Sequence, residues 1–439
     1  MTTVAMHGPG NGHRPQALEM TAFTPLRDAV SARLKAAAEG TAPQVDVNTV
    51  IQQELDTYAR QTIRAGGQPL DPAAEARVRQ ALHDTFTGAG GLEALLNDPT
   101  IETININGHD TVFVLRRDGT KDQVGPVAAS DAELEAMFRD MAAAAARRGG
   151  HERRFDRAEP ELSLQLPNGA RLHALMDVSD RVCASIRLFP SQPESLDELV
   201  HRGELTPGMA GLFEAMVNAR LNIVVSGGPG TGKTTLLGAL GGAIPRQRRV
   251  MTVEDTFELR FDRAEHPDMV RIQTRLANTE GVGEFDMSRG VRASQRTTPE
   301  VVIVGEVRGA EVVWMAKAMS MGIDGSMCTV HASDSAQALL RMIAYAMEPP
   351  AAYTRDAAVA LLASAVHVVV HLDFARDGSR VVSSVREVAG TDGKEILSNE
   401  VYAPGPDKRA VPATGLRAGT VDRLAAVGFD PAALYQDRW

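Results

Sequence analysis

The stretch LNIVVSGGPGTGKTTLLGAL contains the pattern G-x-x-x-x-G-K-T, which runs from Gly227 to Thr234. It follows an apolar run and opens a helical one, the context expected of a loop that binds phosphate groups. Glycines let the backbone wrap around phosphates so that successive N–H groups point inward, and the helix N-terminus adds the positive end of its dipole. Lys233 would reach the β- and γ-phosphates, and the Thr234 hydroxyl would bind magnesium. We therefore predict a site for ATP and Mg²⁺. The predicted nucleotide-binding residues are Gly227, Gly228, Pro229, Gly230, Thr231, Gly232, Lys233, Thr234 and Thr235.

Carboxylates follow two further apolar runs. Glu254 and Asp255 end the run in VMTVEDTFEL, and Glu306 follows Gly305 in EVVIVGEVRG. In a parallel sheet, strand ends beside a phosphate-binding loop face the ligand crevice. Two adjacent carboxylates there are costly unless a cation or a water network uses them, whereas helix capping by Asp255 or Thr256 is the alternative interpretation. Gly305 stands where a Walker B motif would place an aspartate, so the site is either defective or divides its work differently.

The elements that must position these residues alternate. From about Leu205 the apolar runs LNIVVS, RVMTVE, VVIVGE and SMCTVHA are separated by helical stretches. This alternation predicts a parallel sheet covered by helices, within a domain that spans 205–439. Near the C-terminus, Asp377-Gly378 and Asp392-Gly393 predict hairpin turns.

The first half of the chain shows different sequence patterns. Residues 1–45 are rich in Gly, Pro and Ala, which predicts a poorly ordered segment. Helical patterns follow within 46–90, the second with Asp71 as its N-cap. Residues 91–190 mix alternating strand patterns with one helix that begins with a capping box, Ser130 to Glu133, which predicts a compact α+β domain. Residues 191–204 read as a linker that contains a short helix.

Composition predicts a soluble protein of two or three domains, because the 439 residues are 44% hydrophobic and 23% charged. The net charge of −10 argues against wholesale nucleic-acid binding. We expect Cys183 and Cys328 to be buried thiols in a reducing compartment, since no metal-ligand spacing is present. The N-terminus lacks the apolar core of a signal peptide, and the most apolar run, 357–372, is shorter than the ~20 residues of a membrane-spanning helix. We expect a cytoplasmic protein that can dock on a membrane complex.

Four motifs now identify a family. GGPGTGKTT, TVEDTFEL, VVIVGEVRG and GSMCTVHA occur in that order and resemble the Walker A, Asp box, Walker B and His box of the secretion ATPase superfamily, which serves type II secretion, type IV pili and type IV secretion. VRIQTR, followed by NTEGVGEFDMSRGVRASQRTTPE, looks most like the CpaF/TadA branch, which powers Tad/Flp pili. The resemblance covers about 91–388. It implies an α/β fold, with a RecA-like P-loop ATPase domain preceded by a smaller α+β, PAS-like domain and N-terminal helices.

The resemblance implies roles for individual residues. The Walker B strand of this family commonly ends in Gly-Glu, so Glu306 would hold magnesium, partly through water, together with Thr234 and Asp255. Glu254 of the Asp box would polarise the attacking water. His331 matches the His-box histidine near the γ-phosphate. The resemblance thus implies a working ATPase site in which Glu306 takes the role of the missing Walker B aspartate.

Arginines from elsewhere in the chain also match. Arg171 and Arg187 correspond to the arginines of the N-terminal domain that meet the nucleotide across the domain cleft, a role that suits a permanent, bidentate cation. Arg271, Arg275 and Arg308 are weaker candidates for the same cluster or for a subunit interface. With Lys233, Glu254, Glu306 and His331, the pair Arg171 and Arg187 completes the catalytic candidates.

The leading interpretation is an oligomeric motor ATPase on the inner face of the cell membrane. The resemblance implies a hexameric ring that transmits movement to inner-membrane platform proteins of a pilus or secretion system, with no specific nucleic acid as partner. One alternative is a type IV secretion or conjugation ATPase, which the ATPase motifs do not distinguish. Another is a nucleotide-binding switch or scaffold with little turnover. A recombinase is disfavoured, because basic loops with aromatic residues are not evident.

Overall fold

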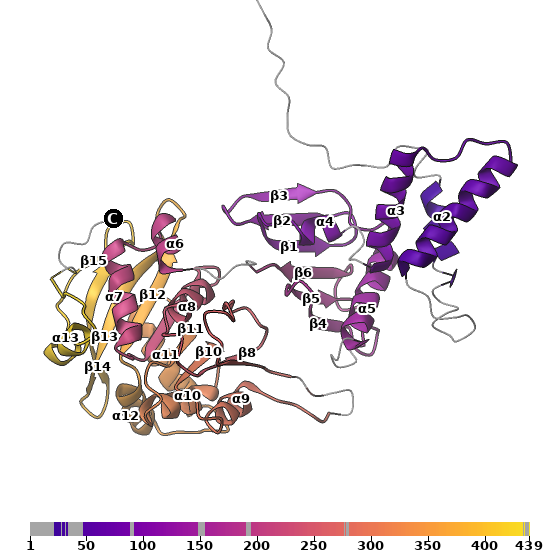
Figure 1. Ribbon diagram of the computed structural model, residues 1–439. Helices are drawn as coiled ribbons and strands as arrows, with labels where there is room; N and C mark the ends of the chain where they lie inside the picture. The colour runs from indigo at the N-terminus through magenta and orange to yellow at the C-terminus, as the bar shows by residue number, and fades with distance from the viewer. Residues whose placement is uncertain are drawn as a thin grey trace, which may run out of the picture. The chain divides into compact units, whose positions relative to one another are not determined.

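The structure is a computed structural model that describes residues 22–27, 29–30, 32–33, 47–87, 92–147, 154–189, 195–275, 277, 281–432, 434 and 439. The chain divides into two compact units, Met1–Leu188 and Phe189–Trp439 (Figure 1). Among the described residues, no helix is both long and apolar enough to cross a bilayer.

The first unit opens with packed helices. Helix α2 spans Val47–Arg64 and α3 spans Pro72–Thr87, as the helical patterns predicted. Asp71 caps α3, because its Oδ1 accepts the backbone N–H groups of residues 73 and 74 at 2.9 and 2.8 Å. Residues 22–27 are also helical, and Ala22 and Leu26 are buried against α2 and α3. This corrects the expectation of poor order for that part of 1–45; most of the remainder lies outside the described residues.

A six-stranded antiparallel sheet forms the body of the first unit, with strand order β3-β2-β1-β6-β5-β4. Apolar side chains alternate with polar ones along the strands, so one face buries residues such as Ile104, Leu172 and Ile186. Phe138 of α5 belongs to the same hydrophobic cluster. The elements are α4 Glu93–Leu96, β1 Ile101–Asn107, β2 Val112–Arg116, β3 Lys121–Val124, α5 Asp131–Arg147, β4 Glu161–Gln165, β5 Arg171–Leu175 and β6 Cys183–Arg187.

The start of α5 departs slightly from the predicted capping box. Ser130 Oγ accepts the backbone N–H of Glu133 at 3.2 Å, as expected. The Glu133 carboxylate, however, accepts the N–H of Ala129 at 2.8 Å. The reciprocal bond is therefore shifted by one residue along the chain.

The second unit is built on a nine-stranded sheet with order β15-β14-β13-β12-β7-β11-β10-β8-β9. The six strands from β12 to β9 are parallel, as the alternation predicted, and β13, β14 and β15 add an antiparallel extension. The strands are β7 Ile223–Gly227, β8 Val250–Glu254, β9 Met269–Gln273, β10 Val301–Val307, β11 Met327–His331, β12 Val368–Phe374, β13 Arg380–Thr391, β14 Ile396–Pro404 and β15 Ala410–Pro412.

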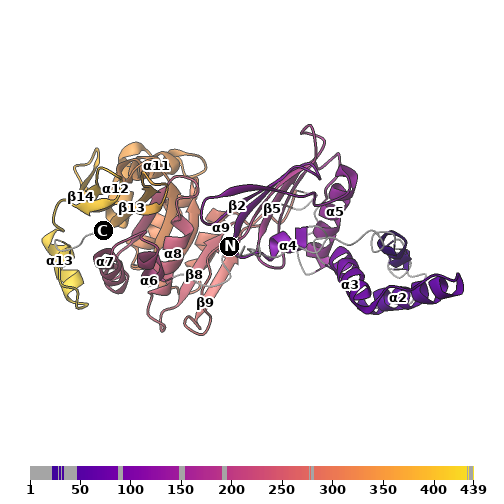
Figure 2. The same ribbon diagram turned by 90° about the horizontal axis from the view of Figure 1, so that it is seen from above.

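Helices cover both faces of this sheet. Figure 2 shows α7 and α8 on one side and α11 and α12 on the other. The short helix expected in the linker is α6, and it packs with α7 and α8 as part of the second unit. The helices are α6 Leu196–His201, α7 Pro207–Asn218, α8 Lys233–Gly242, α9 Met287–Ser294, α10 Glu311–Ser320, α11 Ser335–Met347, α12 Arg355–Ala365 and α13 Ala418–Ala425.

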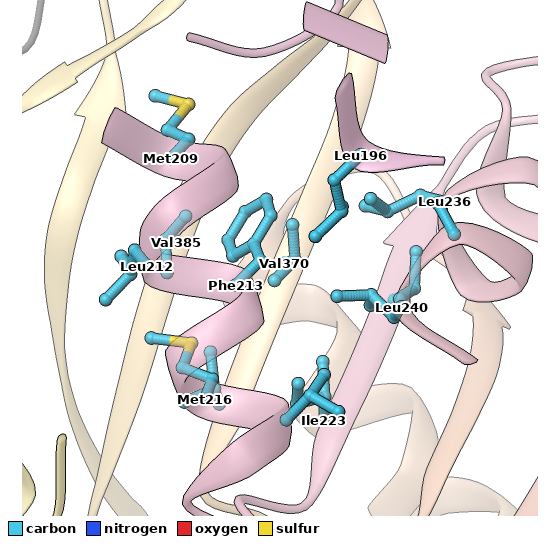
Figure 3. Packing of buried hydrophobic residues seen from close by; sticks show 14 of the residues in the cluster. Leu196, Met209, Leu212, Phe213, Met216, Ile223, Leu236, Leu240, Val370 and Val385 are labelled. Atoms are coloured by element: carbon cyan, nitrogen blue, oxygen red, sulfur yellow. The ribbon is translucent and has the colours of Figure 1, made fainter. Parts of the chain in front are cut away.

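Two hydrophobic clusters hold the sheet between these helices. In the first, Phe213 of α7 lies beside Val370 of β12, with Leu240 of α8 nearby (Figure 3). Burial of one such side chain contributes about 1.5–3 kcal/mol. The second cluster lies under α10, α11 and α12. Because β7 sends Ile223 into the first cluster and Val224 into the second, the strand that leads to the glycine-rich loop is clamped on both faces.

Candidate active site

The glycine-rich loop connects β7 to α8 at the carboxyl edge of the parallel strands. Gly227 has φ +158°, and a Cβ added there would lie 2.5 Å from Thr231 Oγ1 and 2.6 Å from the Leu372 carbonyl oxygen, so no larger residue fits. Gly232, which precedes α8, has φ +94°, a conformation that favours glycine. Thr231 Oγ1 donates to the Gly228 carbonyl at 2.9 Å and closes the loop. The backbone thus has the shape predicted for a phosphate cradle.

Lys233 lies at the first turn of α8, and its side chain turns back over the loop. Its Nζ donates to the Gly228 carbonyl at 2.8 Å and lies 3.2 Å from His331 Nδ1. An ammonium group only donates hydrogen bonds, so Nδ1 is the acceptor and the imidazole proton lies on Nε2. Burial, followed by the charge of Lys233, lowers the pKa of His331, which keeps the ring neutral. The His box therefore reaches the P-loop directly.

Glu306 lies on the other side of His331. His331 Nε2 is 2.7 Å from Glu306 Oε1, but without hydrogen-bond alignment, so Oε1 is a buried acceptor with no hydrogen-bond partner among the described residues. Arg308 Nε donates to the second oxygen of the same carboxylate at 2.8 Å. One oxygen of Glu306 is thus held in place, and the other is left to accept a ligand from the site.

Glu254, the residue predicted to polarise the attacking water, is buried and hydrogen-bonded in the structure. Its side chain is only 2% exposed. Oε2 accepts the backbone N–H groups of Glu258 and Leu259 at 2.9 and 2.8 Å, and Oε1 accepts the Thr252 hydroxyl at 3.0 Å. Arg271 Nη2 lies 3.6 Å from Oε1. Burial raises the pKa of Glu254, and these donors oppose the shift. Both carboxylate oxygens therefore already accept hydrogen bonds, and those to Oε2 stabilise the turn that follows β8.

Glu258, four residues later, is the carboxylate that faces the P-loop. Its Oε2 accepts the Thr234 hydroxyl at 3.4 Å, the hydroxyl predicted to bind magnesium. Glu258 is not among the predicted site residues. The signal that could have found it is the spacing: when Glu254 caps the N–H of Glu258, the chain turns and brings that side chain back toward α8.

Asp255 is occupied as well. Its Oδ1 accepts the Thr274 hydroxyl at 3.0 Å, and its Oδ2 lies 2.9 Å from Arg308 Nη1. No helix begins here, so the capping alternative is wrong. Asp255 shares Arg308 with Glu306, and the ion pairs raise the pKa of this arginine although its burial acts in the opposite direction. In this structure Asp255 serves to position Arg308.

The other arginines of the second unit that were candidates, Arg271 and Arg275, have different contacts. Arg271 lies behind Glu254 and over the Phe257 ring, at 4.3 Å from its centroid. Arg275 donates to the Gly283 carbonyl at 2.8 Å, in a short antiparallel bridge away from the P-loop contacts. Arg308 therefore contacts the site through Glu306, and Arg271 contacts Glu254. Arg275 contacts neither carboxylate.

Arg171 and Arg187 lie in the first unit and form a pair of their own. They are directly opposite each other on neighbouring strands, Arg171 on β5 and Arg187 on β6. Their row continues to Thr103 on β1 and Gln165 on β4. Neighbouring positions on antiparallel strands share a face, so both guanidinium groups emerge from the side opposite the α5 core. Their approach to a nucleotide stays a prediction.

The chain's own atoms fit a magnesium ion that is shared with phosphates. Among the described residues, no three His, Cys, Asp or Glu side chains form a cluster that could hold a metal. Magnesium in nucleotide sites needs no such cage, because phosphates and waters supply most of its ligands. The Thr234 hydroxyl, the Glu258 carboxylate and the Oε1 of Glu306, which accepts no hydrogen bond from a described residue, are oxygen donors of the required kind.

Comparison with known proteins gives consistent matches. The model of a family described as type II/IV secretion system protein matches residues 87–390. A putative conjugal transfer protein of Mycobacterium tuberculosis H37Rv is 34% identical over 323 residues, which cover 72% of this chain and 88% of the relative. The probable conjugal transfer protein TrbB of Sinorhizobium fredii is 25% identical over 345 residues, 77% of this chain and 98% of the relative.

Solved structures with weaker likeness are secretion and pilus ATPases. The VirB11 ATPase of the Brucella suis type IV secretion system is 22% identical, with a TM-score of 0.36 over 70% of this chain and 98% of that one. The pilus retraction motor PilT with bound ADP is 16% identical, with a TM-score of 0.46 over 76% of this chain and 87% of that one.

Proposed function

Because the chain belongs to the type II/IV secretion system protein family, whose members are ATP hydrolases, we propose that it is the motor ATPase of a type IV secretion or conjugation apparatus. The support for this system is the description of its 34% identical relative as a putative conjugal transfer protein, and of a second relative as TrbB. A motor of the CpaF/TadA branch, which the sequence motifs resemble, is therefore the second candidate.

One observation carries the ATPase assignment at the level of the site. Lys233, His331 and Glu306 form a continuous chain of contacts beside the P-loop, and Glu258 contacts Thr234 in the first turn of α8. One cation, a neutral imidazole and two carboxylates thus converge where the terminal phosphate of a bound nucleotide would lie. Phosphoryl transfer needs this combination of charge stabilisation and water orientation.

The roles that we propose differ from the sequence prediction at three carboxylates, Glu254, Glu258 and Asp255. Glu258 orients the attacking water and accepts its proton, while Glu254 holds the turn that aims Glu258. Lys233 binds the phosphate charge. Thr234, Glu258 and Glu306 would hold magnesium, partly through water, and the ion would neutralise charge on the phosphates when bound. His331 fixes the distance between Lys233 and Glu306 and would report on the occupancy of the γ-phosphate position.

A Tad/Flp pilus motor is the second candidate. The segment NTEGVGEFDMSRGVRASQRTTPE favours it, because this stretch, which leads into β10, most resembles the CpaF/TadA branch. In both cases we propose a hexameric ring of identical chains, bound to inner-membrane platform proteins on the cytoplasmic side. Arg171 and Arg187 would complete the site when the first unit closes over the nucleotide.

Two measurements test the proposal. Lys233→Ala should lower steady-state phosphate release by roughly a hundredfold or more, because the phosphates lose their main cation. Lys394→Ala, at an exposed turn, is the matched control and should retain activity. Negligible phosphate release by the wild-type chain in every oligomeric state would instead favour a switch or scaffold.

A trapped variant identifies the apparatus. Glu258→Gln should retain ATP without turnover, so that pull-down from membranes captures the working complex. Relaxase and coupling proteins among the captured chains would support conjugation. Pilins and pilus platform proteins would support the second candidate.

A further inference from the structure

Two paired residues at the β12–β13 hairpin border the P-loop on the side of β12. We call this pair the β12–β13 ledge and define it as Phe374, the last residue of β12, and Arg380, the first residue of β13, which face each other in the ladder. Arg380 Nε donates to the Gly230 carbonyl at 2.8 Å. The tip of the Phe374 ring lies 3.8 Å from the position that a Cβ on Gly230 would take. The ledge therefore touches the tip of the phosphate loop.

The ledge and the proposed catalytic groups lie on opposite sides of the P-loop strand. In the sheet, β7 has β12 on one side and β11 on the other. His331 ends β11, Glu306 lies on the next strand, β10, and Glu258 follows β8 beyond it. A nucleoside triphosphate is an elongated molecule with its terminal phosphate at one end. If that phosphate points toward β11 and β10, the nucleoside points toward β12 and the ledge.

Phe374 has the properties of a surface for a flat ligand. It is 39% exposed and does not belong to the hydrophobic clusters of the second unit, so packing does not account for it. Ion pairs brace the ledge from behind: Lys408 Nζ lies 2.7 Å from Asp373 Oδ2, and Arg409 Nη2 lies 2.8 Å from Asp377 Oδ2. An aromatic ring on a braced strand end is preorganised for stacking.

We propose that Phe374 stacks against the base of the bound nucleoside triphosphate, while Arg380 holds Gly230 in place beneath it. This inference rests on the proposed function, because it requires a nucleotide in the P-loop. Every base has a flat π-face, so stacking of this kind adds affinity without selecting the base. Phe374 thus makes the site a receptor for nucleosides and not merely for a triphosphate chain.

The test separates the base from the phosphates. Phe374→Leu keeps an apolar side chain over Gly230 but removes the aromatic face. Its dissociation constant for ATP should rise about tenfold, while that for inorganic tripolyphosphate, which has no base, should stay within a factor of two of wild type. KM for ATP should rise with little change in kcat. Phe374→Tyr, which restores the ring, should recover wild-type affinity for ATP.

Met321→Ala is the control. Met321 is 77% exposed at the end of α10, and this helix runs back to the edge of the sheet opposite the P-loop. Its affinities should match wild type. Unchanged ATP binding by Phe374→Leu would overturn the proposal, and so would an equal loss of ATP and tripolyphosphate, because Phe374 would then act only on the shape of the loop. A wild-type protein that binds neither ligand would overturn the proposed function itself.

Discussion

Gly305 and Glu254 lie in contact across the neighbouring strands β10 and β8. A Cβ at position 305 would lie 3.2 Å from Glu254 Cγ and 3.6 Å from its Cβ. The position at which a Walker B motif would carry an aspartate is therefore filled by the side chain of the Asp-box glutamate. This contact explains why a glycine occupies position 305, and the carboxylate of this strand follows one residue later, at Glu306.

Gly305→Asp should destabilise the protein, because it forces a Cβ against Glu254 and adds a second carboxylate beside a buried one. Overpacking alone costs typically ~1–3 kcal/mol, so the unfolding midpoint in denaturant should fall clearly. Gly305→Ala should show the steric part of the loss. Gly419→Ala, where an added Cβ meets nothing within 4 Å, is the control and should not lower stability. Wild-type stability of Gly305→Asp would show that the contact relaxes without cost.

Glu258→Gln and Glu254→Gln should differ in what they damage. Glu258→Gln keeps the shape of the side chain but cannot accept a proton, so turnover should fall by roughly 10²–10⁴ while ATP still binds. Its melting temperature should change little. In Glu254→Gln an amide replaces a carboxylate that accepts two backbone N–H groups and a hydroxyl, so the melting temperature should fall together with turnover. The reverse pattern would restore Glu254 as the base.

Arg187→Ala should lower hydrolysis by about tenfold or more with little loss of stability, if the pair Arg187 and Arg171 meets the nucleotide. Arg157→Ala, whose side chain is 90% exposed in the same unit, is the control. The fragment from Phe189 onward has its own sheet and two hydrophobic clusters, so it should fold, bind ATP weakly and hydrolyse it slowly. Full-rate hydrolysis by this fragment would show that the arginines are not needed.

The two cysteines should react with thiol reagents at different rates. Burial raises the pKa of the Cys328 thiol to about 12, and its side chain lies inside the second cluster. Cys183, which we expected to be buried, is partly exposed on β6. Because the thiolate is the reactive form, iodoacetamide at pH 8 should label Cys183 alone in the native protein. Mass spectrometry after labelling provides the measurement, and rapid modification of Cys328 without denaturant would contradict this burial.

What the sequence predicted well is local. The glycines, Lys233 and Thr234 lie within a single strand–loop–helix unit, so their spacing alone determined their arrangement. The order of apolar runs likewise predicted the parallel strands. The carboxylates were harder, because what each one does depends on which backbone groups face it. Glu254 stands where a base was expected, and only the fold shows that its oxygens accept hydrogen bonds from the following turn and that Glu258 contacts Thr234 of the P-loop.

The pairing of Gly227 has a mechanical consequence. This first residue of the cradle is held in the ladder from both sides, opposite His331 on one strand and Leu372 on the other. The floor of the site is therefore stiff before any ligand arrives, and little of the binding energy is spent in shaping it. The segment 255–268, which follows β8 and carries Glu258, belongs to no strand and lacks such a ladder. Displacement driven by the chemistry would start in this segment, while the floor remains still.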